Sequence, residues 1–253
     1  MTTPAPSAIY PSLKGRKVLI TGGGSGIGAG LVTGFVRQGA IVHFIDLVDD
    51  VSATLDTGVL GQKPVFHKCD LTDTPLLEKT LAAILADGPV HILLNNAARD
   101  DRHSLSEVTS EFFDANIAVN LKHMAMCTRA VAPGMKAAGG GAILNFGSIS
   151  WHLGLPDLVL YETAKAAIEG FTRALARELG PDNIRVTTII PGNVKTKRQE
   201  KWYTPEGERQ IVEAQCLPGR IVPENVAALA MFLASDDAAL CTGHGYWIDA
   251  GWR

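Results

Sequence analysis

Tyr161 and Lys165 lie four residues apart in the stretch VLYETAKAAIEGF, which covers Val159 to Phe171. Residues at this spacing share one face of an α-helix, so the phenol and the ammonium are predicted to lie close together. A free tyrosine has a pKa of about 10 and is a weak base at neutral pH. A neighbouring positive charge favours the phenolate, and we therefore expect Lys165 to lower the pKa of Tyr161. Ser148 follows an apolar run earlier in the chain, and its hydroxyl is predicted to hold a substrate oxygen beside the phenol.

A glycine-rich segment, TGGGSGIG (Thr21–Gly28), follows one predicted strand and opens a predicted helix. The free amides and the dipole at a helix N-terminus favour a pyrophosphate group. Gly22 suits the tight turn, and Gly26 and Gly28 permit close approach of the backbone. The segment therefore predicts a dinucleotide site, and its presence gives weight to a Y-x-x-x-K pattern that alone is commonly due to chance.

Asp46 ends the second predicted strand, where an acidic side chain can accept hydrogen bonds from an adenosine ribose. A carboxylate there repels a 2′-phosphate, and neither Ser25 nor Leu47 supplies a compensating positive charge. These residues predict NAD rather than NADP. After the next two strands, Asp70 is a candidate to reach the adenine edge, and Asn95–Ala98 is a candidate for close backbone approach. Each of these two segments is also typical of a turn or a helix cap.

The elements that must position these residues follow from an alternation of short apolar runs with longer helical patterns. Apolar residues in succession are typical of strands that are covered on both faces. Seven strands are predicted at Lys17–Thr21, Ile41–Asp46, Val65–Cys69, Val90–Asn95, Ala142–Phe146, Arg185–Ile190 and Gly245–Ile248. Helices are predicted at Ile27–Gln38, Pro75–Ala86, Thr109–Ala138, Tyr161–Leu179 and Glu224–Ala234. These repeated β–α–β units predict an α/β, single-domain, doubly wound Rossmann fold with a mainly parallel seven-stranded sheet.

Two segments fall outside this alternation. Residues 1–14 are rich in proline and are predicted to form a flexible N-terminal tail, so the single domain is predicted to cover residues 15–253. Residues 191–222 include the polar, partly helical stretch KTKRQEKWYTPEGERQ. A long insertion of this kind is a surface loop or a lid over a substrate site.

The composition limits the classes of function. The 253 residues include 46% hydrophobic side chains, enough for a large core, and the formal net charge of −3 gives no reason to expect nucleic acid or a membrane as a partner. The N-terminus lacks the pattern of a signal peptide, and no run of about 18 apolar residues predicts a membrane span. The four cysteines and seven histidines form no pattern of metal ligands, so we expect reduced thiols, a cytoplasmic location and no metal site.

Together these motifs resemble those of the short-chain dehydrogenase/reductase family from Gly15 to Gly251. The residues that carry the resemblance are Thr21–Gly28, Asp70, Asn95–Ala97, Asn120, Ser148, Tyr161, Lys165 and Pro191–Gly192. The resemblance implies that Tyr161 is the general acid/base, that Lys165 lowers its pKa and binds the nicotinamide ribose, and that Ser148 orients the substrate. It implies that Asn120 holds a water in a proton relay, and that the protein is a homotetramer. The implied NAD contacts are Gly22, Ser25, Gly26, Ile27, Gly28, Asp46, Asp70, Leu71, Asn96, Ala97, Tyr161, Lys165, Pro191, Gly192 and Val194.

The sequence departs from the family pattern at two points. Ala98 stands where the family often has a glycine after N-N-A, and a methyl group is tolerated there if the backbone has a negative φ. The late D-G-G of the family is Asp249-Ala250-Gly251 here. Neither change touches the predicted acid/base residues.

Stretches outside the cofactor motifs resemble bacterial sugar 1-dehydrogenases of the family, among them DDRHSL, NFGSISWHLGLPDLVLYETAKA and YWIDAGWR. This resemblance implies oxidation of an aldopentose at the anomeric carbon to the lactone, with D-xylose as the first choice and L-arabinose or another sugar as the alternative. A sugar site needs polar groups beside an aromatic surface. The candidates are Ser148, Ser150, Tyr161, Asn193 and Trp202, with Trp151 or His152 as alternatives to Trp202.

Two other functions remain open. An oxoacyl-thioester or steroid reductase of the same fold would use the basic residues of the predicted lid for docking. These residues are Lys195, Lys197, Arg198 and Lys201, with Glu200 and Glu206 among them, so a solvated face is the simpler interpretation. The second is a non-enzymatic protein that senses NAD, and the complete set of Ser148, Tyr161 and Lys165 argues against it.

Overall fold

A single parallel sheet forms the centre of the protein in the computed structural model, which describes residues 8–52, 62–200 and 204–252. Its strand order is β3-β2-β1-β4-β5-β6-β7, and all neighbouring strands are parallel. The strands are β1 (Lys17–Thr21), β2 (Ile41–Asp46), β3 (Val65–Lys68), β4 (Ile92–Asn95), β5 (Gly141–Phe146), β6 (Ile184–Pro191) and β7 (Gly245–Ile248). The predicted α/β doubly wound fold with a seven-stranded sheet is confirmed.

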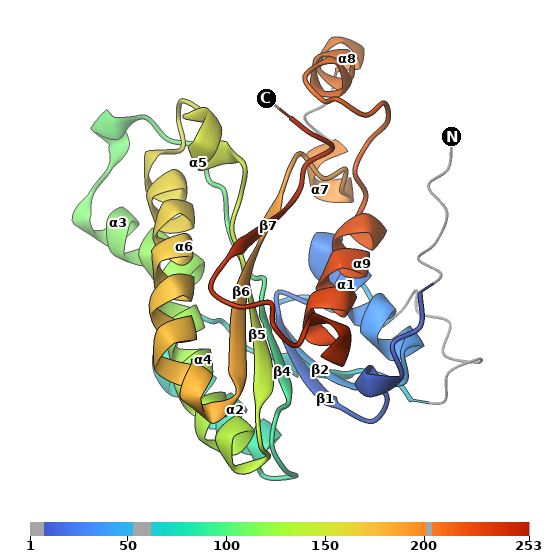
Figure 1. Cartoon of the computed structure of the whole chain (residues 1–253). Helices are drawn as coiled ribbons and strands as arrows, with labels where there is room; N and C mark the ends of the chain where they lie inside the picture. Colours follow the sequence, from blue (N-terminus) through green and yellow to red (C-terminus); the bar gives the residue numbers. More distant parts are fainter. Residues whose placement is uncertain (1–7, 53–61, 201–203, 253) are drawn as a thin grey trace.

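Helices cover both faces of this sheet (Figure 1). One face carries α1 (Gly26–Arg37) and α9 (Pro223–Ala234), and the other carries α2 (Thr74–Leu85), α4 (His123–Ala137) and α6 (Val159–Leu179). Successive strand residues point to opposite faces. In β1, Val18 and Ile20 therefore join the buried cluster under α1 and α9, whereas Leu19 joins the cluster under α2 and α4. No helix in the described parts of the chain has the length and apolar character needed to cross a membrane.

The predicted helix Thr109–Ala138 is divided in the structure. It consists of α3 (Ser110–Ile117), a π-helical turn at Ala118–Lys122, and α4. Three short helices lie towards the end of the sheet where β5 and β6 finish: α5 (Ser150–Leu153), α7 (Lys197–Glu200) and α8 (Pro205–Glu213) (Figure 1). The remaining helical turns are 3₁₀ turns at Pro11–Leu13, Leu105–Glu107, Gly180–Asp182 and Asp236–Ala238.

The predicted flexible tail is too long at its C-terminal end. Leu13 is 1% exposed, and the Tyr10 N–H donates to Gln38 Oε1 at 2.8 Å. The Asp236 N–H donates to Ser12 Oγ at 3.1 Å. Residues 8–14 are therefore packed against the domain. One buried apolar residue and a few hydrogen bonds hold this segment, and neither produces a periodic pattern in the sequence. Residues 1–7 of the predicted tail lie outside the described residues.

Candidate active site

The sequence motifs meet at the edge of the sheet formed by the carboxyl ends of the strands. Gly22 follows β1, Asp46 ends β2, Asn96 follows β4, Ser148 follows β5 and Gly192 follows β6. In open parallel sheets, ligands bind at this edge, near the point where the strand order changes direction. That point lies between β1 and β4 here. The fold therefore brings the predicted cofactor and catalytic residues to one edge.

The glycine loop has no room for side chains at several positions, Gly22 and Gly28 among them. Gly22 has φ +68°, and a Cβ placed on it would lie 2.8 Å from the Cα of Ala97. A Cβ on Gly28 would lie 1.8 Å from the carbonyl oxygen of Gly22. Ser25 precedes α1 without forming a side-chain cap, so the first amides of this helix are left for a ligand. A close glycine cradle at an uncapped helix N-terminus fits the pyrophosphate of a dinucleotide.

Asn96 fastens the glycine loop to the loop after β4. Its Nδ2 donates to the carbonyl oxygens of Thr21 at 3.0 Å and Gly22 at 2.9 Å. Thr21 Oγ1 in turn accepts from the N–H groups of Asn96 at 3.0 Å and Ala97 at 3.1 Å. The Asn96 side chain thus holds the backbone of the glycine loop in position. The condition under which an alanine is tolerated at Ala98 is met, since this residue is not among those with positive φ.

The carboxylate of Asp46 is also joined to the glycine loop. Its Oδ2 accepts from the Gly24 N–H at 2.8 Å, and its Oδ1 accepts from the Leu47 N–H at 2.6 Å and the Val48 N–H at 3.3 Å. Lys68 on β3 is the register partner of Asp46. Lys68 is distant from Asp46 in the chain, so the residues next to Asp46 in the sequence did not indicate this cation. No ion pair joins the two side chains within the described residues.

The remaining predicted cofactor residues lie at the same edge of the sheet, and some of their side chains are buried while others form hydrogen bonds within the protein. Asp70 Oδ1 accepts from the Thr72 N–H at 2.9 Å and the Thr72 hydroxyl at 2.7 Å, and these hydrogen bonds lower the pKa of Asp70. Leu71 and Val194 are buried, so their backbone rather than their side chains faces a ligand. Ile27 packs against the core, and the Gly192 N–H donates to Ile248 O at 2.9 Å. The Pro191 carbonyl accepts from the Ile149 N–H at 3.1 Å, which joins the ends of β5 and β6.

Lys165 is buried below Tyr161 on α6. Its side chain is 2% exposed, its Nζ donates to the carbonyl oxygen of Phe146 at 2.7 Å, and the Nζ lies 5.4 Å from the centroid of the Tyr161 ring. Burial lowers the pKa of Lys165 to about 7. The predicted proximity of the two side chains is therefore confirmed.

The predicted lowering of the Tyr161 pKa is wrong for the polypeptide itself. Burial around the hydroxyl raises the pKa of Tyr161 to about 12, although a hydrogen bond with the Ser148 side chain opposes this effect. The Lys165 ammonium is directed at the Phe146 carbonyl, and its own charge is disfavoured by the same burial. Desolvation therefore outweighs the expected effect of the cation.

The Ser148 hydroxyl is oriented by the start of α5. The Ser150 N–H donates to Ser148 Oγ at 3.1 Å, so the Ser148 O–H is left to donate towards the phenol or a substrate oxygen. The Ser150 hydroxyl oxygen is itself buried and has no hydrogen-bond partner within the described residues. Ser150 therefore supports Ser148 through its backbone.

Asn120 lies in the π-helical turn and holds the loop after β4. Its Oδ1 accepts from the Arg99 N–H at 2.8 Å, and its Nδ2 donates to Arg99 O and to Asn116 Oδ1, both at 3.0 Å. Both amide hydrogens of Asn120 are thus in use. Single-turn π-helical segments are frequent at functional sites.

Two of the aromatic residues proposed to face a sugar, Trp151 and His152, both contact Glu169. The Trp151 Nε1–H donates to Glu169 Oε1 at 3.0 Å, and His152 Nε2 lies at the same distance from that oxygen. Glu169 is two helical turns beyond Tyr161 on α6, so these rings lean along the helix towards Trp247, whose ring centroid is 4.3 Å from that of His152. Trp202, like Lys201 of the predicted basic surface, lies outside the described residues.

Asn193 is held by the predicted lid. Its Oδ1 accepts from Arg220 Nη2 at 2.8 Å, and Arg220 Nη1 lies 2.5 Å from Glu208 Oε1 on α8. A sugar that bound to Asn193 Oδ1 would therefore have to share this oxygen with Arg220.

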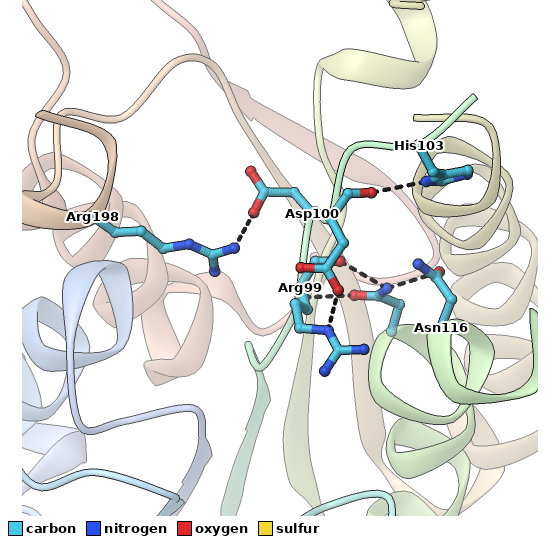
Figure 2. Close-up of polar contacts among 7 residues, drawn as sticks. Arg99, Asp100, His103, Asn116 and Arg198 are labelled. Atoms are coloured by element: carbon cyan, nitrogen blue, oxygen red, sulfur yellow. Dashed lines mark hydrogen bonds and ion pairs between the residues drawn. The ribbon is translucent and has the colours of Figure 1, made fainter. Parts of the chain in front are cut away.

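A further polar contact crosses the site without having been predicted. Arg198 on α7 reaches Asp100 in the loop after β4, with 2.6 Å between Nη2 and Oδ1 (Figure 2). The DDRHSL stretch had been noted only for its resemblance. Within the described residues, no group of three or more His, Cys, Asp or Glu side chains is placed to hold a metal ion.

Comparison with known proteins agrees with this geometry. The family model described as enoyl-(acyl carrier protein) reductase matches residues 22–253. A D-xylose 1-dehydrogenase of Caulobacter vibrioides is 68% identical over 249 residues, which cover 98% of this chain and 99% of the relative. A probable galactose dehydrogenase of Rhizobium meliloti is 45% identical and covers 97% of this chain and 98% of its own. The solved structure of a 7α-hydroxysteroid dehydrogenase, complexed with NADH and 7-oxo glycochenodeoxycholic acid, has a TM-score of 0.89 at 28% identity and covers 96% of both chains.

Proposed function

The chain belongs to the short-chain dehydrogenase/reductase family, and we propose that it oxidises an aldopentose, D-xylose first, at the anomeric carbon to the aldonolactone with NAD. The observation that carries the proposal is the assembly of Ser148, Tyr161 and Lys165 in a chain that matches a D-xylose 1-dehydrogenase at 68% identity over nearly its whole length. L-arabinose or another aldose is the alternative. The 45% identity to a probable galactose dehydrogenase also supports a sugar 1-dehydrogenase.

The chemistry assigned to the chain's own residues is a proton transfer. When bound, an oxidised nicotinamide supplies the acceptor for the hydride of the anomeric carbon. Tyr161 accepts the proton of the anomeric hydroxyl as general base, and the Ser148 O–H holds the same oxygen in place. Tyr161 can accept this proton only as the phenolate, whereas burial favours the neutral phenol. Positive charge near the hydroxyl favours the phenolate, and Arg198 lowers the pKa of Tyr161 in this way. Lys165 is held in position by the Phe146 carbonyl.

Asn120 is proposed to support the removal of this proton. Because its side chain is occupied by Arg99 and Asn116, a relay water would bind to the backbone of the π-helical turn. Exchange of one helical hydrogen-bond pattern for another at this turn frees backbone groups for such a water.

The fold is a dinucleotide-binding fold, and NAD is proposed as the preferred dinucleotide. Asp46 lies at the end of β2 with its carboxylate fixed by three backbone amides, so a 2′-phosphate would meet a negative charge that cannot move away easily. Lys68, the register partner of Asp46, reduces this repulsion but does not bind the carboxylate. We therefore expect a marked preference for NAD with some residual use of NADP.

The test of the proposed function is the appearance of NADH with D-xylose, L-arabinose, D-glucose and a simple secondary alcohol. Turnover of an aldose and formation of a lactone are expected. Activity on the secondary alcohol alone would reject the sugar assignment while the family assignment stands. A reductase of oxoacyl or steroid substrates is less well supported, because Arg198 of the proposed docking surface is already paired with Asp100. NAD binding without any turnover would favour a sensing protein.

We also propose that the enzyme is a cytoplasmic homotetramer. The four cysteines are all described and all free, which is the usual state in a reducing compartment. The outer strand β7 carries Trp247, which is 44% exposed, and Leu240 before it is 98% exposed. An exposed sheet edge with large apolar side chains is commonly covered by a partner. Light scattering should give about four times the chain mass of 26.9 kDa, and a monomer would contradict the proposal.

A further inference from the structure

The loop after β4 carries Asp100 between Arg99 and His103, and its backbone is held by hydrogen bonds on both sides (Figure 2). On one side, Asn120 binds both the N–H and the carbonyl oxygen of Arg99, at 2.8 Å and 3.0 Å. On the other side, the His103 N–H donates to Asp157 O at 2.9 Å, and the Leu160 N–H donates to His103 Nε2 at 3.4 Å. The backbone on either side of Asp100 is therefore anchored, by Asn120 at Arg99 and by Leu160 at His103.

Arg198 approaches Asp100 from the other side of the site. Arg198 lies on α7, which follows β6, and Asp100 lies in the loop after β4. The Arg198 side chain is 58% exposed and the Asp100 side chain is 42% exposed. Only Oδ1 of the carboxylate and Nη2 of the guanidinium are used in this contact. Within the described residues, the second carboxylate oxygen and the other guanidinium N–H groups make no further hydrogen bond, and both are accessible to solvent.

The charges of this pair act on the reacting group. Asp100 raises the pKa of both Tyr161 and Lys165, and Arg198 lowers the pKa of Tyr161. The hydrogen bond from the Leu160 N–H to His103 Nε2 places this loop beside the start of α6, so the pair lies on the side of the site where Tyr161 begins the helix. A substrate that binds Tyr161 through one hydroxyl would extend its remaining hydroxyls towards neighbouring polar groups.

The pair is better suited to ligand binding than to stability. An exposed ion pair adds little to the stability of a fold. A carboxylate that accepts and a guanidinium that donates can together bind adjacent hydroxyl groups by charge-assisted hydrogen bonds. An acyl chain or a steroid skeleton has no adjacent hydroxyls to satisfy both partners.

We propose that Asp100 and Arg198 bind the ring hydroxyls of the sugar that lie away from the anomeric carbon, and so determine specificity for a polyhydroxylated substrate. The inference rests on the proposed function and assigns substrate contacts to two residues that no sequence motif indicated. It also gives α7 a direct role in the site, through Arg198.

The first experiment compares Asp100→Asn and Arg198→Gln with the wild-type enzyme on D-xylose and on its 3-deoxy and 4-deoxy analogues. Each variant should raise KM for D-xylose by about 10-fold or more, since hydrogen bonds to charged groups are among the stronger ones. Wild-type enzyme should lose kcat/KM by at least about 10-fold on one deoxy analogue, and the variants should lose this discrimination. Calorimetric binding of D-xylose to the enzyme saturated with NADH should weaken by a similar factor.

The matched control is Glu78→Gln, which breaks another exposed ion pair, with Arg129, between α2 and α4. This variant should keep the wild-type KM. An unchanged KM in both Asp100→Asn and Arg198→Gln would overturn the inference and leave the proposed function intact, whereas a wild-type enzyme that oxidises no aldose would overturn the proposed function. If a variant fails to fold, the deoxy analogues decide with wild-type enzyme alone, because equal kcat/KM on all three sugars would refute the contacts.

The pH profile separates a substrate contact near Tyr161 from a purely structural role. The charged groups that face the phenol are Asp100, Arg198, Glu162 and Lys165. Because Asp100 raises the pKa of Tyr161 and Arg198 lowers it, Asp100→Asn should move the rise of kcat/KM to lower pH, and Arg198→Gln should move it to higher pH. Movement of both profiles in the same direction, or of neither, would contradict the placement of the pair beside the phenol.

Discussion

Replacement of Lys165 by methionine is expected to make the protein more stable at neutral pH and inactive. The lysine is 2% exposed, and burial lowers its pKa from 10.5 to about 7. At about 1.4 kcal/mol for each tenfold change in proton affinity, the charged form of Lys165 opposes folding by about 5 kcal/mol. Methionine removes this cost but leaves the Phe146 carbonyl without its donor, which costs about 1–3 kcal/mol. The free energy of unfolding should therefore rise by about 2 kcal/mol or more near pH 7.

The dependence on pH identifies the cause. A group whose pKa is lower in the folded state gives stability that is present above its unfolded pKa and is lost as the pH falls towards its folded pKa. Wild-type protein should therefore gain stability relative to Lys165→Met as the pH rises from about 7 towards 10.5, and the advantage of the variant should shrink or reverse. Urea unfolding at pH 6.5, 8 and 9.5, without added dinucleotide, measures this difference.

A constant difference between the two proteins across this range would refute the argument, because it would mean that Lys165 keeps an ordinary pKa in the folded state. Lys17→Met provides a control for the removal of a buried lysine. Lys17 is 6% exposed, and its Nζ donates to the carbonyl oxygens of Ile84 at 3.0 Å and Gly88 at 3.2 Å. This variant should be destabilised, since two carbonyl groups lose their donor.

Three further predictions concern the cradle, the cofactor and the base. Gly28→Ala should lower the free energy of unfolding by at least about 1–3 kcal/mol and weaken NAD binding, because its Cβ would lie 1.8 Å from Gly22 O. Gly180→Ala, with nothing within 4 Å, should instead stabilise by about 0.5 kcal/mol in the same urea titrations. Asp46→Ala should raise kcat/KM with NADP relative to NAD by about 10-fold or more, and an unchanged ratio would contradict the assigned repulsion. Tyr161→Phe should reduce kcat by at least about 100-fold while NAD binding, followed by calorimetry, is kept, and near-normal turnover would show that another group carries the proton.

The strands and the glycine cradle were predictable because their causes are local. The apolar runs at Lys17–Thr21 and Ile41–Asp46 match β1 and β2 at both ends, and the glycines of Thr21–Gly28 are required by contacts within a single turn. The start of α8 also carries a local signal that was not used. Thr204 accepts from the Gly207 N–H at 3.1 Å, and Pro205 follows it at the first helical position, a common start of a helix.

The features that were not predicted depend on contacts between distant parts of the chain. Asp100 and Arg198 meet only because β4 and β6 end at the same edge of the sheet. The Trp151 side chain is held in place because Glu169, on the next helix, accepts its indole N–H. The pKa of Tyr161 is decided by burial, which no spacing of residues reveals.

The places where local rules fail cluster around the reactive residues. A lysine is fully buried without a carboxylate partner, although such a residue opposes folding. The helix before it changes to a π-helical turn at Asn120, where an uninterrupted α-helix would keep its own hydrogen bonds. Both features persist because other contacts hold them: the Phe146 carbonyl fixes Lys165, and the Arg99 backbone fixes Asn120. Costs of this kind are expected where function rather than stability selects the residue. If the site is maintained at a cost in stability, Lys165→Met should be both more stable than the wild-type protein and inactive. Urea unfolding and the NADH assay on this one variant test both expectations.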